Sequence, residues 1–434
     1  MNKKLIALAV ASLVSVPAFA AGSEVQFYGM LDAGVDSATN VAGTNAAGAA
    51  SNSTNNVGRV SDYGSYFGLK GSEDLSNGLS GIWQIEQGIS VNGGNTNSSS
   101  GAVVGSGAGK GTNVFGANPY NNQRNTFVGL SSAAAGTVLV GVHDTPYKMA
   151  TAQMDPFADT MGDYNGLVGS FGGAGSAGNG LLGGAGASGY FDLRPSQVLA
   201  YVSPNMGGLT VVGAYVFGNA LNAGQPLTGY NPVGTQTLSN VNGDVYSVAA
   251  MYTAGPLYLT ASYEQHDFGS AGSLAVNGIG GAANLTLNGA SNSAYKLGAA
   301  YSIMDTTLSV LYENSTDNFG TNGGNLLGHD TWYVSAKHTM GAWDIALAYA
   351  NAGSDNTNGS LVGLNNASTG AQQWTIGGDY NFSKNTQIYA LYTEISNDAG
   401  SMYNFADTTN PVVFGSAIGG ANISAVSLGI KHTF

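Results

Sequence analysis

Apolar and polar residues alternate with a period of two along much of the chain, which is the pattern of a half-buried β-strand. In residues 257–266 one face carries Leu257, Leu259, Ala261 and Tyr263, and the other carries Tyr258, Thr260, Ser262, Glu264 and His266. The same alternation recurs at 295–303, 343–349 and 426–434. One face is apolar with Tyr or Trp near its ends, and the other is small, polar or charged. The pattern predicts a row of amphipathic antiparallel strands.

The links between these strands alternate in length. Seven are short, such as Gly255-Pro256 and Met304-Asp305, and eight are long and rich in Gly, Asn, Ser and Thr, such as 37–62, 91–123, 148–193 and 269–291. Fifteen links join sixteen strands, and short turns at one end with long loops at the other are typical of outer-membrane barrels. We therefore predict an all-β fold, a 16-stranded antiparallel transmembrane β-barrel with short periplasmic turns and long extracellular loops. A secreted β-sandwich or β-solenoid is the alternative, although a sandwich would bury the apolar faces.

The first twenty residues, MNKKLIALAVASLVSVPAFA, have the layout of a secretory signal peptide. Lys3 and Lys4 precede an apolar run, and Ala18-Phe19-Ala20 forms a cleavage site. The apolar run is about half of the roughly 20 residues that a membrane-spanning helix needs. We expect residues 1–20 to be removed and residues 21–434 to form the barrel domain. Loss of the two lysines changes the formal net charge from −13 to −15.

Composition narrows the class of protein further. The 434 residues include 67 Gly and no Cys, and only 9% are charged, whereas soluble domains average about 25%. The mean hydropathy of +0.02 is too high for a solvated disordered chain. The acidic net charge argues against nucleic-acid binding, which needs a basic surface. No segment offers 18 consecutive apolar residues, so a chain that crosses a bilayer would have to do so as a closed barrel.

Two Gly-rich stretches imitate nucleotide-binding motifs. Residues 105–112 read GSGAGKGT, but the phosphate-binding pattern needs Gly where Val104 stands and Ser or Thr where Gly111 stands. Residues 173–178 fit G-x-G-x-x-G by letters, yet they lie in a low-complexity stretch without a preceding strand. We interpret both as loop sequence.

Catalytic and metal-binding patterns are weak. The five histidines, His143, His266, His329, His338 and His432, are dispersed and lack H-x-x-x-H or H-E-x-x-H spacing. We expect no enzyme activity, no metal and no cofactor. A Ser, a His and an acid brought together by the fold would be the sign of an outer-membrane hydrolase.

Several short stretches occur in a recognisable order. They are Val25–Gly34 (VQFYGMLDAG), Phe67–Leu75 (FGLKGSEDL), Asp155-Pro156-Phe157, Tyr201–Pro204 (YVSP) and the terminal Gly429–Phe434 (GIKHTF). The ordered series resembles the Gram-negative trimeric porins, especially those of beta-proteobacteria. The resemblance implies a homotrimer of 16-stranded barrels in the outer membrane, each a water-filled channel with its third loop folded into the pore. It also implies that Phe434 is part of a terminal signal read by the barrel-assembly machinery.

In this family, acidic residues on the third loop face a ladder of basic residues on the wall. Asp155, Asp159 and Asp163 occupy that loop here. The resemblance places Arg124, Arg194 and Lys70 at the basic side of the constriction, with Arg59 and Lys148 as possible additions. Tyr66 and Val142 stand where the family usually has Arg.

Three carboxylates facing a thinned basic ladder predict a preference for cations, since rings of one charge sign select counter-ions. Each Asp has an alternative role as a residue that fixes the loop, and Asp155-Pro156 is a turn-initiating pair. Glu86, Glu264, Glu313 and Glu394 fall on polar strand faces near loop ends. They predict an acidic vestibule, or else pair with loop amides or with divalent ions and lipopolysaccharide.

The sequence therefore predicts a passive outer-membrane channel for ions and small hydrophilic solutes. Its expected partners are two further copies of the chain, outer-membrane lipid and lipopolysaccharide. A substrate-specific channel of the same fold is the first alternative. A surface adhesin or structural protein that uses its long loops is the second.

Overall fold

The computed structural model describes residues 24–41, 55–92, 124–171, 190–218, 243–269, 273–278, 281–286, 289–319, 321–356, 368–399, 401, 403–406 and 420–434. Every structural statement below concerns these residues. The predicted signal peptide and both Gly-rich motifs lie outside them.

Strands dominate the described part of the chain. In order they are β1 (Glu24–Val41), β2 (Asn55–Asp62), β3 (Tyr66–Asp74), β4 (Leu79–Gly88), β5 (Thr126–Ser132), β6 (Gly136–Val142), β7 (Val198–Val202), β8 (Leu209–Val216), β9 (Val245–Ala254), β10 (Leu257–Asp267), β11 (Ser273–Gly278), β12 (Gly281–Thr286), β13 (Ser291–Ile303), β14 (Thr306–Asp317), β15 (Asp330–Met340), β16 (Trp343–Ala352), β17 (Ala371–Asn381), β18 (Thr386–Asn397) and β19 (Asn422–Thr433). Short helices are α2 (Pro146–Met149), η2 (Ala152–Met154), η3 (Tyr164–Gly166) and η4 (Thr321–Gly323).

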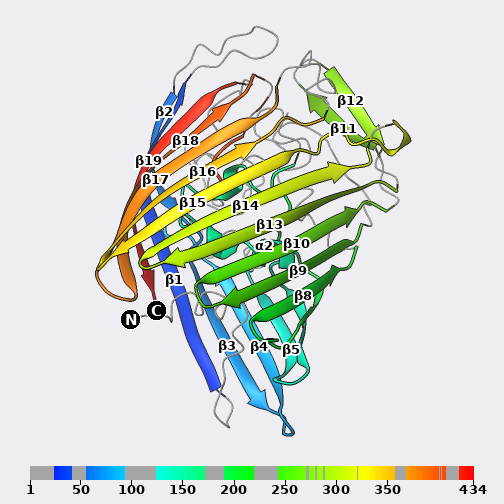
Figure 1. The fold of residues 1–434 in the computed structure, drawn as a ribbon, viewed down its shortest axis with the longest axis vertical. Helices are drawn as coiled ribbons and strands as arrows, with labels where there is room; N and C mark the ends of the chain where they lie inside the picture. Colours follow the sequence, from blue (N-terminus) through cyan, green and yellow to red (C-terminus); the bar gives the residue numbers. More distant parts are fainter. Residues whose placement is uncertain are drawn as a thin grey trace, which may run out of the picture.

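The main sheet closes on itself. Each strand pairs antiparallel with its neighbour, and β1 pairs with β19 from Met30↔Thr433 to Val41↔Asn422. Figure 1 shows the tilted strands wrapping from β1 round to β19. The first part of β1 pairs with β3 and its last part with β2, so β2 and β3 act as one interrupted strand. Counted in this way, the ring holds the sixteen strands that the sequence predicts.

The interruption between β2 and β3 is a local feature that the alternation did not predict. Gly64 there has φ +75°, a conformation that Gly adopts without the strain of a Cβ. The Tyr63 amide donates to the Asp32 carbonyl at 3.1 Å, and the Asp32 amide donates to Ser65 Oγ at 2.9 Å. These bonds hold β1 to the chain where the regular ladder is missing.

Each strand presents its apolar face outward. Leu259 and Tyr263 are 41% and 39% exposed, whereas Tyr258 and Glu264 on the opposite face are 1% and 0% exposed. Exposed aromatic residues gather near both strand ends. At the loop end they are Tyr246, Tyr263, Tyr295, Trp332, Trp374 and Tyr392, and at the turn end Tyr252, Tyr301, Trp343, Phe382 and Phe434. This is the arrangement expected at the two interfaces of a bilayer.

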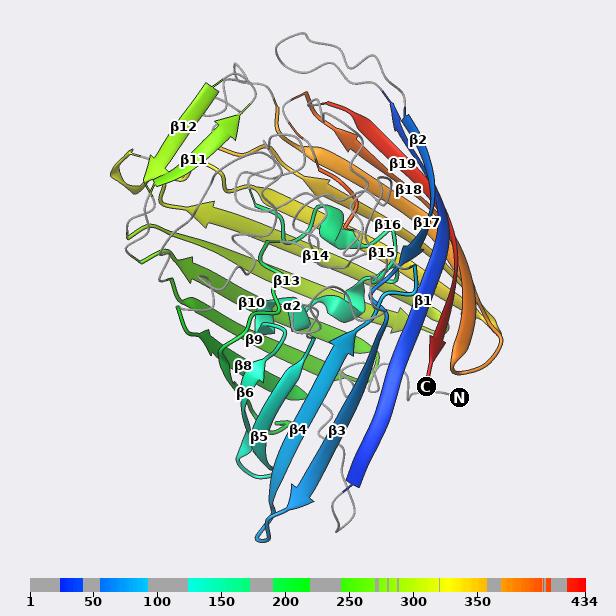
Figure 2. The same ribbon diagram turned by 180° about the vertical axis from the view of Figure 1, so that it is seen from behind.

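Two predicted loops are wrong in detail. The stretch 269–291 contains the separate hairpin β11–β12, with Ser273 opposite Thr286, which Figures 1 and 2 show beside the loop end of the barrel. The predicted loop 37–62 is shorter, because β1 reaches Val41 and β2 starts at Asn55. β1 and β2 extend beyond the part of the sequence in which apolar and polar residues alternate. Backbone hydrogen bonds between strands do not depend on side-chain polarity.

Candidate functional site

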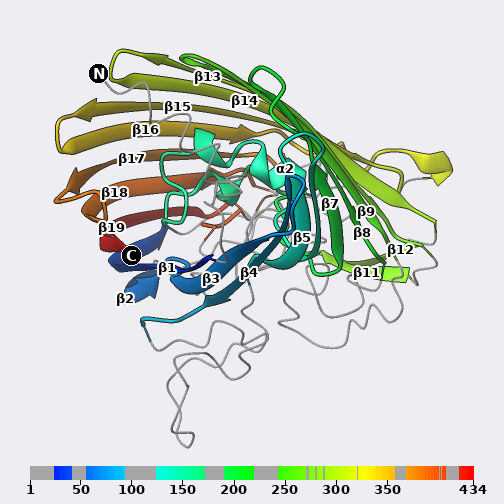
Figure 3. The same cartoon turned by 90° about the horizontal axis from the view of Figure 1, so that it is seen from below.

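The described residues that follow β6 lie inside the barrel. We call residues 143–171 and 190–194 the inner segment; it carries α2, η2 and η3, and Figures 2 and 3 show it within the ring of strands. Inward side chains of the wall donate hydrogen bonds to its backbone carbonyls. Tyr258 Oη reaches Ala150 at 2.6 Å, Ser335 Oγ reaches Met154 at 2.8 Å, and Thr375 Oγ1 reaches Gly162 at 3.3 Å. These donors belong to β10, β15 and β17, so the segment is attached along a wide arc of the wall.

Small residues on the wall make room for the inner segment. A β-carbon at Gly298 would lie 2.7 Å from Met154 Sδ, and one at Gly377 would lie 2.9 Å from Phe157 Cε1. Both distances are below van der Waals contact, so any larger residue would displace the segment. Part of the Gly content of the chain therefore serves close packing inside the barrel.

Two of the three predicted acidic residues fasten the inner segment. The Asp155 carboxylate accepts hydrogen bonds from the amides of Phe157 and Tyr164 and from Tyr333 Oη, each at 2.9 Å. Burial raises the pKa of Asp155 to about 6, although the Tyr164 and Phe157 amides favour its ionised form.

Asp163 caps η3 by accepting from the Asn165 amide at 2.8 Å. Burial and the nearby Asp155 raise the pKa of Asp163 as well. The carboxylates of Asp155 and Asp163 are thus occupied by hydrogen bonds within the protein, and neither is placed to attract ions strongly.

Asp159 is the exposed acidic residue of the inner segment. Its backbone has φ +55°, a left-handed conformation that Asp adopts more readily than most residues. Asp159 Oδ1 lies 3.6 Å, and Arg124 Nη1 3.7 Å, from the position that a β-carbon at Gly64 would occupy. Gly64 therefore leaves a gap in which a carboxylate of the inner segment and a guanidinium at the wall face each other.

Arg124 is held at the wall by Glu86 and Tyr66. Arg124 Nε lies 2.6 Å from Glu86 Oε1, and its Cζ lies 4.5 Å from the Tyr66 ring centroid. Tyr66 thus occupies the family's usual Arg position and supports the guanidinium of a different residue. The Arg124 side chain keeps 20% of its surface exposed.

Lys70 continues this row of aromatic and basic side chains. Lys70 Nζ lies 4.9 Å from the Tyr28 ring centroid, and Tyr28 meets Tyr66 edge to face at 6.2 Å. Tyr28 Oη donates to Glu86 Oε2 at 3.0 Å. Cations over aromatic faces are stabilised by the ring quadrupole.

Arg194 and Lys148 share one carboxylate, Asp144. Arg194 Nε lies 3.0 Å and Lys148 Nζ 3.1 Å from Asp144 Oδ1. Burial would raise the pKa of Asp144, but the charges of Arg194 and Lys148 outweigh it and hold that pKa below its usual range. The trio carries a net positive charge, since two bases share one carboxylate. The sequence pattern did not predict that Asp144 would be this shared partner.

Three further basic residues of the wall are also paired. Arg59, predicted as a possible addition to the ladder, lies 3.4 Å from Asp36. Lys431 lies 3.0 Å from Asp32, and Lys337 lies 3.2 Å from Asp344. Together, the six partly exposed bases Arg59, Arg124, Lys148, Arg194, Lys337 and Lys431 contact five carboxylates. In the described part of the wall, these six bases therefore stand in ion pairs rather than in a ring of one sign.

The four glutamates of the predicted vestibule have different positions. Glu86, Glu264 and Glu313 face inward and are 6%, 0% and 1% exposed. Glu394 accepts a hydrogen bond at 2.7 Å from Tyr392, which is exposed on the outward face. The prediction of a common acidic vestibule is therefore wrong for Glu394. Side chains alternate between the two faces of β18, and Glu394 lies on the same outward face as Tyr392.

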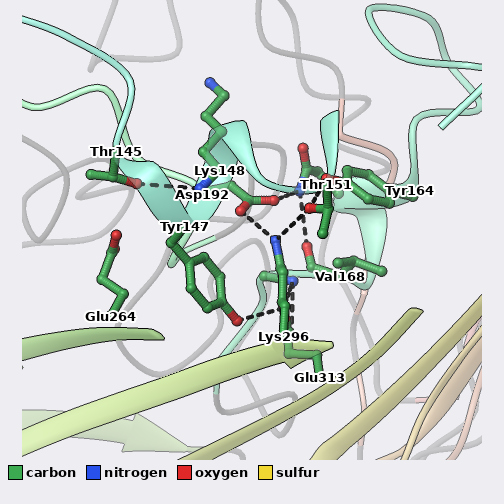
Figure 4. Close-up of polar contacts among 12 residues, drawn as sticks. Thr145, Tyr147, Lys148, Thr151, Tyr164, Val168, Asp192, Glu264, Lys296 and Glu313 are labelled. Atoms are coloured by element: carbon green, nitrogen blue, oxygen red, sulfur yellow. Dashed lines mark hydrogen bonds and ion pairs between the residues drawn. The ribbon is translucent and has the colours of Figure 1, made fainter. Parts of the chain in front are cut away.

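The structure also contains a buried charged cluster that the sequence pattern did not predict. Lys296 on β13 is fully buried, with Nζ 2.5 Å from Asp192 Oδ1 and 3.7 Å from Glu313 Oε2. Figure 4 shows Lys296 pointing from the wall into the inner segment between Tyr147, Thr151 and Asp192. The only hint in the sequence is a lone Lys on the otherwise small face of the predicted strand 295–303.

Phe434 closes the seam of the barrel. Its amide donates to the Gly29 carbonyl, and the Gly29 amide donates to the Phe434 carbonyl, both at 3.0 Å. The Phe434 ring lies 5.4 Å from the ring of Phe27. Its role as an assembly signal stays a prediction.

The described residues form neither a metal-binding cluster nor an accessible pair of catalytic side chains. Within the described ranges, no group of three or more His, Cys, Asp or Glu side chains could hold a metal ion. His266 Nε2 contacts Glu264 Oε1 at 2.9 Å, but both side chains are buried and out of reach of a substrate. The described part of the chain also has no helix long and apolar enough to cross a membrane.

Comparison with known proteins places the chain in a family. A family model described as Gram-negative porin matches residues 7–400. Among curated relatives, the major outer membrane protein P.IB of Neisseria gonorrhoeae is 33% identical over 168 residues, 39% of each chain. The major outer membrane protein P.IA of Neisseria meningitidis serogroup B is 31% identical over 185 residues, 39% of this chain and 40% of the relative. The chain thus covers about two fifths of the length of these relatives.

Solved structures share the fold over nearly the whole chain. An anion-selective porin from Comamonas acidovorans superposes with a TM-score of 0.62 at 20% identity, covering 95% of this chain and all of that one. OmpT of Vibrio cholerae gives 0.58 at 14% identity, covering 96% and 99%. At these identities the likeness concerns the fold.

Proposed function

The chain belongs to the Gram-negative porin family, and we propose that it forms a water-filled outer-membrane channel through which ions and small hydrophilic solutes diffuse passively. The inner segment would narrow the channel and so set the largest solute that passes. The proposal needs no catalytic step and no cofactor.

One observation carries this proposal. Charged side chains inside a closed barrel keep contact with solvent, among them Asp159, Lys148 and Lys337, the last two with 23% and 39% of their side-chain surface exposed. Charged groups that stay partly exposed inside the ring, even within ion pairs, are hydrated rather than packed against protein. A lumen filled with protein would have buried them.

Single-channel recording of the refolded protein in planar bilayers tests the proposal. We expect long-lived conductance steps, together with swelling of proteoliposomes in solutions of small sugars. Closure in groups of three would support a homotrimer. A folded protein that passes neither ions nor sugars would refute the proposed function.

The predicted preference for cations is retained as a proposal with a narrower basis. Asp155 and Asp163 are engaged with backbone amides, and most lumenal bases have a carboxylate partner. Asp159 is left as the exposed carboxylate beside the gap at Gly64. We therefore expect a modest preference for cations, set by this residue.

A substrate-specific channel is a second candidate, and one observation favours it. Lys70, Tyr28, Tyr66 and Arg124 form a continuous row on the inner wall. Such a row offers cationic N–H groups backed by aromatic rings to a passing anion. Conductance that saturates with one solute would favour this candidate, and linear conductance for all solutes would count against it.

Processing and partners complete the proposal. We propose that residues 1–20 are cleaved on export, which the N-terminal mass of the mature protein would show. Lipopolysaccharide and the barrel-assembly machinery remain expected partners. A surface adhesin role would depend on the long loops, much of which lies outside the described residues.

A further inference from the structure

We infer that Lys296 is the positioning residue that holds the inner segment against the barrel wall. Lys296 takes no part in the constriction itself, because its side chain is fully buried. The inference rests on the proposed function for its effect on current, while the position of the segment is testable on its own.

Lys296 contacts parts of the inner segment that are far apart in sequence. Its Nζ lies 3.4 Å from Thr151 Oγ1 and 4.3 Å from the Tyr147 ring centroid, both at the start of the segment. It also lies 2.5 Å from Asp192 Oδ1, on the return of the segment toward the wall. One ammonium group therefore ties the outgoing and returning arms of the segment together (Figure 4).

Glu313 extends this connection to the middle of the segment. The Gly169 amide donates to both Glu313 carboxylate oxygens at 2.9 Å, and Tyr147 Oη donates to Oε2 at 2.9 Å. Glu313 lies opposite Lys296 in the pairing of β13 with β14. Wall and segment thus share one charged cluster: Lys296 and Glu313 from the wall, Asp192 from the segment.

The charges explain why Lys296 matters more than the other attachments. The bonds from Tyr258, Ser335 and Thr375 are neutral, and each can be replaced by water when the segment lifts. Loss of the Lys296 ammonium would leave two buried carboxylates without a cation, which is among the most unfavourable changes in a protein interior. When the inner segment moves away from the wall, water can reach Asp192 and Glu313. Loss of the ammonium group would therefore favour the displaced position of the segment.

The first experiment measures the position of the segment directly. The chain has no Cys, so cysteines at the partly exposed Ala158 of the inner segment and at Lys384 in an exposed turn can carry spin labels for pulsed electron resonance. We expect one narrow distance in the parent protein and a second, displaced population in Lys296→Met. Removal of one partner of a buried pair should raise the displaced fraction roughly a hundredfold or more, which is about 3 kcal/mol. Lys296→Arg should restore the narrow distance.

A matched control separates this role from general destabilisation. Lys337→Met removes another lysine of the wall, whose partly exposed ion pair with Asp344 at 3.2 Å joins β15 to β16 and does not involve the inner segment. The control should keep the narrow distance. If Lys296→Met does not fold, the double variant Lys296→Met, Asp192→Asn lowers the number of unpaired carboxylates and should fold with a displaced segment.

Current recording gives the second readout. We expect brief partial closures in the open channel of Lys296→Met, and steady current in Lys337→Met and Lys296→Arg. A narrow distance distribution and steady current in a folded Lys296→Met, or in the folded double variant, would overturn the inference. A parent protein with a seated segment but no conductance would instead refute the proposed function alone.

Discussion

Neutralising Asp159 should reduce the cation preference that we propose for the channel. Asn adopts positive φ more readily than most residues, so Asp159→Asn keeps the backbone at φ +55° and removes only the charge. The Asp159 amide still donates to Asp163, because that bond uses the backbone. The inner segment should therefore stay in place.

The magnitude follows from the charge of the exposed Asp159 carboxylate. Two unit charges about 4 Å apart interact by about 1 kcal/mol in water, and we take that separation for an ion that passes the carboxylate. A cation gains this energy and an anion loses it. Removal of the charge could thus change their ratio by up to about thirtyfold, or 2 kcal/mol. Salt with a Debye length of about 10 Å and the charge of Arg124 reduce the effect, and we expect about threefold to tenfold.

The assay is the reversal potential in a planar bilayer under a KCl gradient, from which the K⁺ to Cl⁻ permeability ratio is obtained. Asp305→Asn is the matched control, because Asp305 is exposed in the turn after β13, away from the inner segment. An unchanged ratio in folded Asp159→Asn, or an equal change in both variants, would refute the reasoning. A clear preference for anions in the parent protein would refute the cation proposal itself.

Three further predictions concern packing, pH and the seam. Gly298→Val would place a side chain against Met154, and we expect a loss of about 1–3 kcal/mol, measured as a lower temperature for loss of the heat-modifiable folded form on gels. Burial raises the folded-state pKa of Asp155 from 3.8 to about 6, so its stabilising contribution is complete below about pH 4 and is lost as the pH rises through about 6, by up to about 3 kcal/mol. Urea unfolding against pH should show this decline, and Asp155→Asn should flatten it; a parallel profile would contradict the assignment. Phe434→Ala removes the contact with Phe27 and should lower the yield of folded barrel on refolding into vesicles, whereas an unchanged yield would exclude a role for the ring.

The strand pattern was readable from the sequence because it depends on local geometry. Side chains of a strand point alternately to its two faces, so the alternation at 257–266 is enough to tell which residues face lipid. The number of strands follows from counting turns and loops, and Phe434 follows from the terminal resemblance. The break at Gly64 was not predictable from the alternation, because it only divides the strand that pairs with β1 into β2 and β3. No loop or change of direction marks it in the sequence.

The candidate site was only partly predictable. The eight proposed constriction residues remain a prediction as a group, and Asp155 and Asp159, the same residue type four positions apart in one loop, have different contacts. Asp155 is surrounded by two amides and Tyr333, and that last partner is 178 residues away in sequence. Asp159 projects from the segment and keeps its exposure.

By itself, the sequence determined the class of fold, the two faces of each strand and the length of the links, since backbone geometry and hydrophobic transfer act over a few residues at a time. Only the tertiary structure decided which charges meet. Lys296 is one Lys on a strand until the fold brings Asp192 and Glu313 to it across 104 and 17 positions of sequence. The energy of a charge depends on its surroundings and on the distance to other charges, and those are set when distant strands close into a ring.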